Sequence, residues 1–348
     1  MSTDNLRVKR KIQQLGSSTL AVTLPAEWVR EQELDKGDKL VVQRDETGGS
    51  LLVVPEEPSN HESESTIDAG DMTAASLRRA VIGQYVLGRQ LIRIENDGPF
   101  DPDTLDAVAE VERRLMGLGV VEDGIDTITI RCSVDPGDFG LPTLMERLWR
   151  TEETMRTETV SALLTDDLDA ARRSQNRQRQ VEKLLYLFLR LVFTTYKNPR
   201  LNHCVGLETG FPLIGYRSVA QDIILMSRAN REVSDLLLDA EGFDLDEATA
   251  AVFESVTDRL DRLASVTRRA VTEPSTDTSA LGHEIVTEFE REVADAQSHL
   301  EEARPEPLLA LQRTLTTFEK SGGHASDSLD VATHFASRST PTILAEEE

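Results

Sequence analysis

Residues 10–40 read RKIQQLGSSTLAVTLPAEWVREQELDKGDKL and predict a small module of short strands around one short helix. Residues 7–14 alternate in polarity as a strand does, and the Gly-Ser-Ser sequence after them marks a turn. Pro25 suits the first turn of a helix, where a missing N–H costs little. A second hairpin then closes at Gly-Gly 48–49. The sequence therefore predicts a β-rich module, which we place at residues 7–55.

A module of this size should not fold alone. It offers too little apolar surface to offset the loss of chain entropy. Two copies of the chain can complete one core between them, and closed two-fold symmetry is the commonest solution. We therefore expect a homodimer joined through residues 7–55.

The charge of the chain is uneven. Its formal net charge is −24, with 62 acidic and 38 basic residues, of which only seven are Lys. An acidic surface that is poor in Lys favours a halophilic source. Residues 1–55 hold eight basic and eight acidic residues, so they are neutral. The N-terminal module is thus where this chain repels a polyanion least.

Four cations within residues 7–11 are the candidate DNA contacts. In a strand, Arg7, Lys9 and Lys11 would share one face and Arg10 the other. Such side chains hold phosphates, and Arg also reads guanine edges. Hydroxyl groups of the following turn add neutral donors. The predicted DNA-binding residues are Arg7, Lys9, Arg10, Lys11, Ser17, Ser18 and Thr19. A solvated basic strand in a purely oligomeric module is the alternative.

The middle of the chain predicts a linker and a small α/β insert. Residues 56–70 are polar and poor in apolar side chains, which is typical of a linker. Residues 71–135 mix helical and strand-like patterns. The expected elements are a helix at 74–85, a strand at 91–95, a helix at 103–116 and a strand at 125–134.

The remainder is mainly α. Helical patterns run from residue 141 to 337 and are broken at 166–167, 198–199, 242, 274 and 304–305. Roughly six long helices with short connections predict up-down bundles. We expect two three-helix bundles, at residues 141–242 and 243–338.

The N-terminal segment resembles the AbrB/SpoVT family of swapped-hairpin DNA-binding domains. The likeness lies in RKIQQLGSST at 10–19, LPAEW at 24–28 and KGDKL at 36–40. Residues 77–85 (LRRAVIGQY) and 117–122 (GLGVVE) resemble the insert of archaeal proteins that join an AbrB domain to PhoU domains. The helical pattern, with VEKL at 181–184, is similar to paired PhoU bundles.

The resemblance implies a transcriptional regulator of phosphate uptake. Its partners would be DNA, a second copy, and a phosphate transporter or signalling protein. An adaptor that docks on a transporter or sensor, and uses the N-terminal module only to dimerise, is the alternative. An antitoxin role is disfavoured, because antitoxins are short and here almost 300 mostly structured residues follow the module.

PhoU proteins typically carry acidic pairs four residues apart on one helix face, which together hold metal. This chain has Gln178, Ile224, Arg228 and Gly323 where ligands would be expected. We therefore expect no metal and no other cofactor. A metal-binding PhoU protein remains an alternative, and its weak candidate ligands are Glu288, Glu292, Glu319 and His324.

Other functional classes find little support. No phosphate-binding glycine loop, nucleophile elbow or HExxH motif occurs, so we do not expect an enzyme. No signal peptide or spanning apolar run is visible, which predicts a cytoplasmic protein without membrane insertion. Cys132 and Cys204 have no metal-site spacing and are expected in the core. The arginines of residues 172–179 could bind phosphate, but pairing with nearby acids on the same helix is favoured.

Overall fold

The protein is described from a computed structural model. The structure describes residues 8–16, 19–44, 51–55, 63–198, 201, 205–206 and 211–339. The chain divides into two compact units, Met1–Glu62 and Ser63–Glu348, and each is treated by itself.

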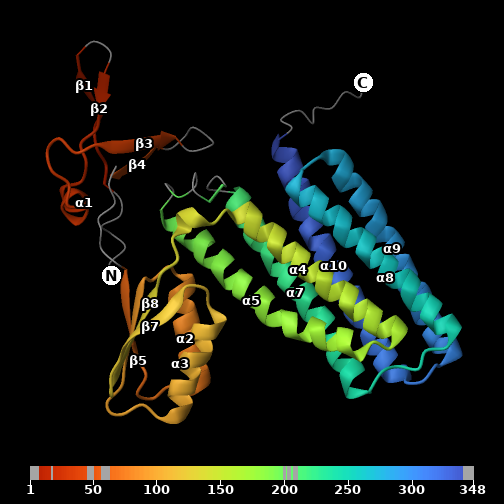
Figure 1. Ribbon diagram of the computed structural model, residues 1–348. Helices are drawn as coiled ribbons and strands as arrows, with labels where there is room; N and C mark the ends of the chain where they lie inside the picture. The colour runs from red at the N-terminus through yellow and green to blue at the C-terminus, as the bar shows by residue number, and fades with distance from the viewer. Residues whose placement is uncertain are drawn as a thin grey trace, which may run out of the picture. The chain divides into compact units, whose positions relative to one another are not determined.

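The N-terminal module holds two hairpins and a short helix (Figure 1). Its elements are β1 (Gln13–Leu15), β2 (Thr19–Ala21), α1 (Ala26–Glu31), β3 (Leu40–Arg44) and β4 (Leu51–Pro55). Strand β1 pairs antiparallel with β2, and β3 with β4. Gly16 has a φ of 78° in the first turn, a conformation that glycine adopts without strain. The predicted order of hairpin, helix and hairpin is confirmed.

The strand predicted at residues 7–14 is wrong over most of its length. Residues 8–12 are not in a strand, and β1 begins only at Gln13. Gln13 pairs with Ala21, the last residue of β2, so earlier residues have no neighbouring strand in the described chain. Polarity alternation alone cannot supply that neighbour. Arg7 lies outside the described residues.

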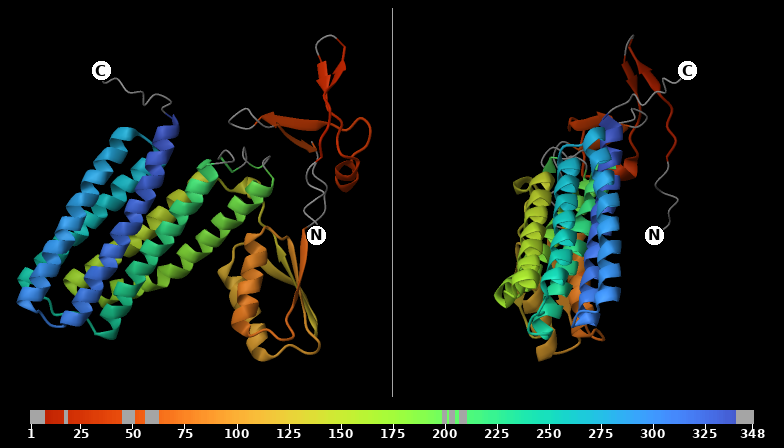
Figure 2. Two further views of the ribbon diagram at one scale, coloured as in Figure 1. Left: turned by 180° about the vertical axis from the view of Figure 1, so that it is seen from behind. Right: turned by 90° about the vertical axis from the view of Figure 1, so that its right-hand side faces the viewer.

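The second unit begins with an α/β layer. Its sheet has the order β5–β6–β8–β7, with β5 parallel to β6 and the other pairs antiparallel. Two helices cover one face of this sheet (Figures 1 and 2). The elements are β5 (Glu64–Asp68), α2 (Ala74–Val86), β6 (Leu91–Glu95), α3 (Pro102–Arg114), β7 (Leu118–Asp123) and β8 (Thr127–Cys132). Cys132 is buried in its core, as expected, whereas Cys204 lies outside the described residues.

Strand β5 corrects the prediction that residues 56–70 form a linker. Residues 64–68 are an edge strand, and Ile67 is buried beneath the helices. This strand is hard to recognise in the sequence, because only one of its faces is apolar and the residues around it are polar. Strand β7 was also not predicted from the sequence. Gly119 and the exposed Val121 break its alternation.

Six long helices form the rest of the described second unit. They are α4 (Leu141–Thr165), α5 (Leu168–Lys197), α7 (Phe211–Asp239), α8 (Glu247–Thr272), α9 (Thr276–Ala303) and α10 (Leu308–Ser339). Helices α4, α5 and α7 pack together, and so do α8, α9 and α10 (Figure 1). The prediction of a mainly α chain with two three-helix bundles is confirmed. None of the helices that the structure describes is long and apolar enough to cross a bilayer.

Short polar side chains fix where these helices begin. The side chains of Asp167, Asp246 and Ser275 accept hydrogen bonds from N–H groups in the first turns of α5, α8 and α9. Such caps satisfy donors that the helix itself leaves free. Asp166 and Arg304 adopt left-handed conformations directly after α4 and α9. The breaks expected from the sequence are therefore the helix ends of the structure.

One apolar core runs through both bundles. Its buried members come from all six helices, and α7 packs against α10 across the two sets. A separate, smaller core fills the α/β layer. Because the bundles share a core, the helical half should behave as a single rigid support for the α/β layer.

Candidate functional site

The basic segment of the N-terminal module is open to solvent. Lys9, Arg10 and Lys11 are exposed and lie in irregular chain just before β1. They make no ion pair with the described part of the chain. Their charge is therefore available to a polyanion. The strand that was predicted to place Lys9 and Lys11 on one face and Arg10 on the other is not present.

The turn residues lie at the other end of the first hairpin. Thr19 is exposed and pairs with Leu15 across the turn, whereas the basic segment precedes the opposite end of β1. Ser17 and Ser18 lie outside the described residues. Within the described chain, the hairpin therefore separates Thr19 from Lys9, Arg10 and Lys11 by the length of β1. The four predicted site residues that the structure describes therefore do not form one cluster.

The same module leaves its large apolar side chains uncovered. Ile12, Leu15, Leu20, Val42 and Leu51 are 59–68% exposed. Helix α1 contains no buried residue. Since each fully buried side chain of this kind stabilises a fold by about 1.5–3 kcal/mol, this surface is unfavourable in water. The described residues of the module therefore leave most of their large apolar side chains without a core.

The positions where metal ligands were sought do not suit a cation. Ile224 is fully buried in the apolar core, and Gln178 is buried with no hydrogen bond to its amide. Arg228 and Gly323 are exposed and offer no carboxylate or imidazole. Isoleucine, arginine and glycine side chains supply no metal ligand, and a neutral amide oxygen is a poorer ligand for iron or zinc than carboxylate, imidazole or thiolate.

The weak candidate ligands do not come together either. Glu288 accepts a hydrogen bond from Arg259 and lies 3.7 Å from Arg262, and Glu292 accepts one from Ser255. Glu319 is exposed. Contacts with α8 thus occupy both acids of the pair on α9: arginines bind Glu288, and a serine hydroxyl binds Glu292.

His324 belongs to a different group. Its ring and the carboxylates of Asp222 and Asp327 place donor atoms within 4.8 Å of one another. Asp222 is on α7 and accepts a hydrogen bond from Ser328 of α10 at 3.0 Å. Burial raises the pKa of Asp222 to about 6. No local sequence pattern shows this group, because Asp222 lies on α7 of one bundle and His324 and Asp327 lie on α10 of the other.

The arginines of residues 172–179 are largely paired with acids. Arg172 binds Asp169 on the same helix, which confirms the expected pairing for that residue. Arg177 instead makes two hydrogen bonds with Glu158 of α4, at 2.8 and 3.0 Å. Arg173 contacts the same carboxylate and also Asp167. The expectation of pairing within one helix is therefore wrong for Arg177, whose partner comes from α4.

The N-terminal segment matches a family of known proteins. Residues 13–60 match the family described as "Antidote-toxin recognition MazE, bacterial antitoxin". The match begins at β1 and contains α1 and both hairpins. It covers the N-terminal module from residue 13 onward and none of the helical half, so the basic segment before β1 lies outside it.

The chain also matches solved structures. One is the crystal structure of PhoU from Pseudomonas aeruginosa, at 12% sequence identity and a TM-score of 0.48. That match covers 57% of this chain and 96% of the other. A search of curated proteins finds no match.

Proposed function

We propose that this protein is a DNA-binding transcriptional regulator of phosphate uptake, in which a dimer of the N-terminal module contacts DNA. The observation that carries the proposal is the basic segment Lys9, Arg10 and Lys11, which is exposed and free of ion pairs with the described chain. Phosphate neutralisation dominates DNA affinity, so this segment is where DNA would bind.

The dimer follows from the uncovered apolar side chains of the module. A second copy would cover Leu20 and Val42 and would double the number of cations on the DNA-facing side. In such a dimer, the basic segment of one chain would lie near the first hairpin turn of its partner. The match to the MazE family over residues 13–60 supports a module of this type.

The helical half would relay phosphate status to the module. This part of the proposal rests only on the resemblance of the sequence to archaeal AbrB–PhoU regulators. We expect the protein to work in the cytoplasm, and its acidic, Lys-poor composition supports a halophilic host.

The test is binding of the purified full-length protein to DNA from upstream of phosphate-transport genes, by fluorescence anisotropy across a salt series. Replacing Arg7, Lys9, Arg10 and Lys11 with Ala should lower the affinity by at least about 100-fold at a fixed salt concentration. The plot of log affinity against log salt should also become flatter, because each lost phosphate contact removes about 0.9 from its slope.

A charge-matched control separates local contacts from net charge. Replacing Arg172, Arg179, Arg231 and Arg291 with Ala changes the net charge equally on exposed helical positions. This variant should bind DNA nearly as the wild type does. Equal affinity of both variants and the wild type would remove the proposed DNA site, and would favour the adaptor in which the module only dimerises.

A further inference from the structure

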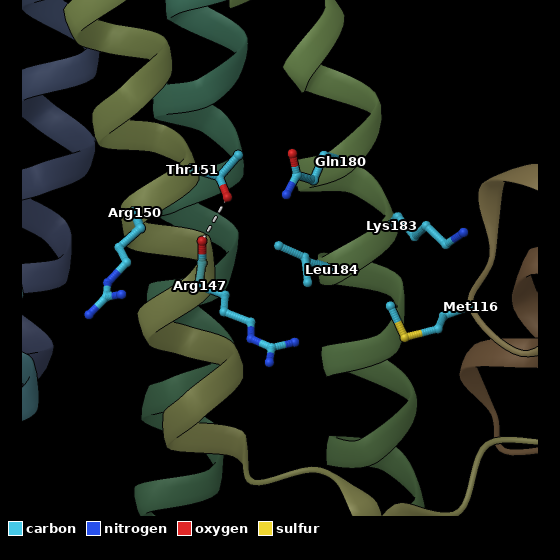
Figure 3. Close-up of a pocket in the computed structure, with 7 residues that line it drawn as sticks. All are labelled: Met116, Arg147, Arg150, Thr151, Gln180, Lys183 and Leu184. Carbon is cyan, nitrogen blue, oxygen red and sulfur yellow. Dashed lines mark hydrogen bonds between the residues drawn. The ribbon is translucent and has the colours of Figure 1, made fainter.

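A surface pocket of about 430 Å³ lies between α4 and α5 in the second unit. Figure 3 shows the side chains that line it. They come from α4, from α5 and from the segment before β7, and they are Met116, Arg147, Arg150, Thr151, Gln180, Lys183 and Leu184. Three of these side chains are cationic and none is acidic. That composition is unusual in the unit that carries most of the negative charge of the chain.

Two of the cations lack acidic neighbours for a reason visible in the sequence. Helical residues three and four positions apart share a face and can form ion pairs. Arg147 has Thr143, Leu144, Arg150 and Thr151 at these positions. Lys183 has Arg179, Gln180, Tyr186 and Leu187. Neither side chain has a hydrogen bond or ion pair within the described chain. Arg150, by contrast, is paired with Glu146 at 2.9 Å.

The acids next to Arg147 and Lys183 in the sequence are bound by other cations. Glu182, adjacent to Lys183, accepts two hydrogen bonds from Arg114, at 2.7 and 3.1 Å. Glu146 is bound by Arg150 and by Arg268 of α8. The acids closest in sequence therefore do not neutralise Arg147 or Lys183, and the pocket keeps a net positive charge.

The pocket has the size and the apolar surface to hold a ligand larger than a single ion. In Figure 3 the guanidinium of Arg147 extends from α4 toward α5, and Gln180 and Leu184 extend from α5 toward α4. The side chains of Lys183 and Arg150 extend away from the space between the two helices, at its edges. Met116 and the buried Leu184 provide an apolar wall. The volume falls within the roughly 300–1,000 Å³ of small-molecule sites. Arg147 and Gln180 can donate hydrogen bonds to an oxyanion while the apolar wall contacts an organic group.

We propose that this pocket binds the phosphoryl group of a small molecule, with Arg147 and Lys183 as its principal contacts and Arg150 as a further cation. A guanidinium fork fits two oxygens of a phosphoryl group, and the flexible ammonium of Lys183 adds a charge that can turn toward it. A ligand in this place would touch α4, α5 and the α/β layer at Met116. The proposal stands on the second unit alone and does not depend on DNA binding.

The phosphoryl group could belong to free inorganic phosphate or to a phosphorylated organic molecule. Isothermal titration of the full-length protein at low ionic strength distinguishes the two sources, with inorganic phosphate, AMP and uncharged adenosine as probes. Low salt is needed because exposed charges are screened beyond about 10 Å at 0.1 M. We expect AMP to bind more tightly than inorganic phosphate and adenosine not to bind. Equal affinities for AMP and inorganic phosphate would assign the site to free phosphate.

The variant Arg147→Ala/Lys183→Ala should weaken binding at least tenfold, because hydrogen bonds to charged groups carry much of such affinity. Arg147→Lys/Lys183→Arg keeps both charges and should retain most of it. Arg179→Ala is the matched control, since it removes an exposed cation from α5 outside the pocket. Thermal unfolding of every variant checks its fold. Failure of AMP and inorganic phosphate to bind, or equal binding by the double variant and the control, would overturn the proposal.

Discussion

Arg190 shows how one residue joins the α/β layer to the helical half. It lies on α5 and is 3% exposed. Its Nη1 donates to the carbonyl oxygens of Tyr85 and Arg89, at 2.6 and 2.9 Å, and its Nη2 donates to that of Gly88 at 3.4 Å. The last carbonyls of a helix lack partners within it, and a cation there also complements the helix dipole. Arg190 therefore caps α2 from another element.

The ring of Tyr85 strengthens the same junction. The Arg190 guanidinium lies 5.0 Å from its centroid, at a distance suited to a cation–π contact. Burial raises the pKa of Tyr85, so its hydroxyl stays protonated and donates to the carbonyl oxygen of Met116 at 3.0 Å. This bond also ties the α/β core to the segment beside the phosphoryl pocket.

We predict that Arg190→Met lowers the free energy of unfolding by about 2–4 kcal/mol. The substitution keeps an unbranched apolar stem but removes three charge-assisted hydrogen bonds. Gly88 N–H and Ser63 Oγ still donate to the carbonyl oxygens of Tyr85 and Gly88, whereas that of Arg89 loses its donor. Arg190→Lys should lie between it and the wild type, because one ammonium cannot reach all three oxygens. Chemical denaturation gives the values, with the exposed Arg179→Met on the same helix as control. Equal stability of the two Met variants would mean that the cap contributes nothing.

At the scale of elements, glycines set how closely α9 and α10 approach. Gly282 of α9 faces Leu329 of α10, and Gly322 of α10 faces the ring of Phe289 on α9. Each helix thus offers a glycine to a large apolar side chain of the other. A glycine inside a helix costs about 1 kcal/mol relative to alanine. The close packing offsets that cost at these two positions.

Gly323 lies next to Gly322 and permits a test in which two alanine variants should change the free energy of unfolding in opposite directions. A Cβ atom at position 322 would overlap the ring of Phe289, whereas one at position 323 would meet no atom within 4 Å. Gly322→Ala should therefore lower the free energy of unfolding by about 1–3 kcal/mol through overpacking. Gly323→Ala should raise it by about 0.5–1 kcal/mol. Denaturant unfolding of both variants decides the matter, and a stabilised Gly322→Ala would refute the close approach.

At the scale of the whole molecule, the two units differ in how they hide apolar surface. The second unit buries large side chains in its own cores. The N-terminal module exposes its apolar side chains, with Leu20 at 68%. This contrast is the reason why we propose that the chain assembles through the module.

We predict that the wild-type chain is a dimer by light scattering and that Leu20→Glu/Val42→Glu is a monomer at the same concentration. Each buried aliphatic side chain contributes about 1.5–3 kcal/mol, and every substitution occurs twice in a dimer, so the dissociation constant should rise at least about 100-fold. Ile125→Glu, at an exposed position of the α/β layer, is the control and should leave the mass unchanged. A monomeric wild type would contradict the prediction.

Local patterns in the sequence were sufficient to locate many features of this protein. Gly16 and Pro25 mark the order of the module because backbone conformation depends on the residue itself. Asp167 and Ser275 mark helix starts for a similar reason. The clustered cations of residues 7–11 can be read directly from the charge distribution. Each of these signals acts over a few residues.

The tertiary structure decided the features that depend on contacts between residues far apart in the sequence. Residues 8–12 lack a strand because β2 ends too early, and residues 64–68 are a strand because β6 lies beside them. Asp222 meets His324, and Arg177 meets Glu158, only after their helices have packed. The pocket likewise requires α4 and α5 side by side. Pairing and packing join residues far apart in the chain, so no local pattern can contain them.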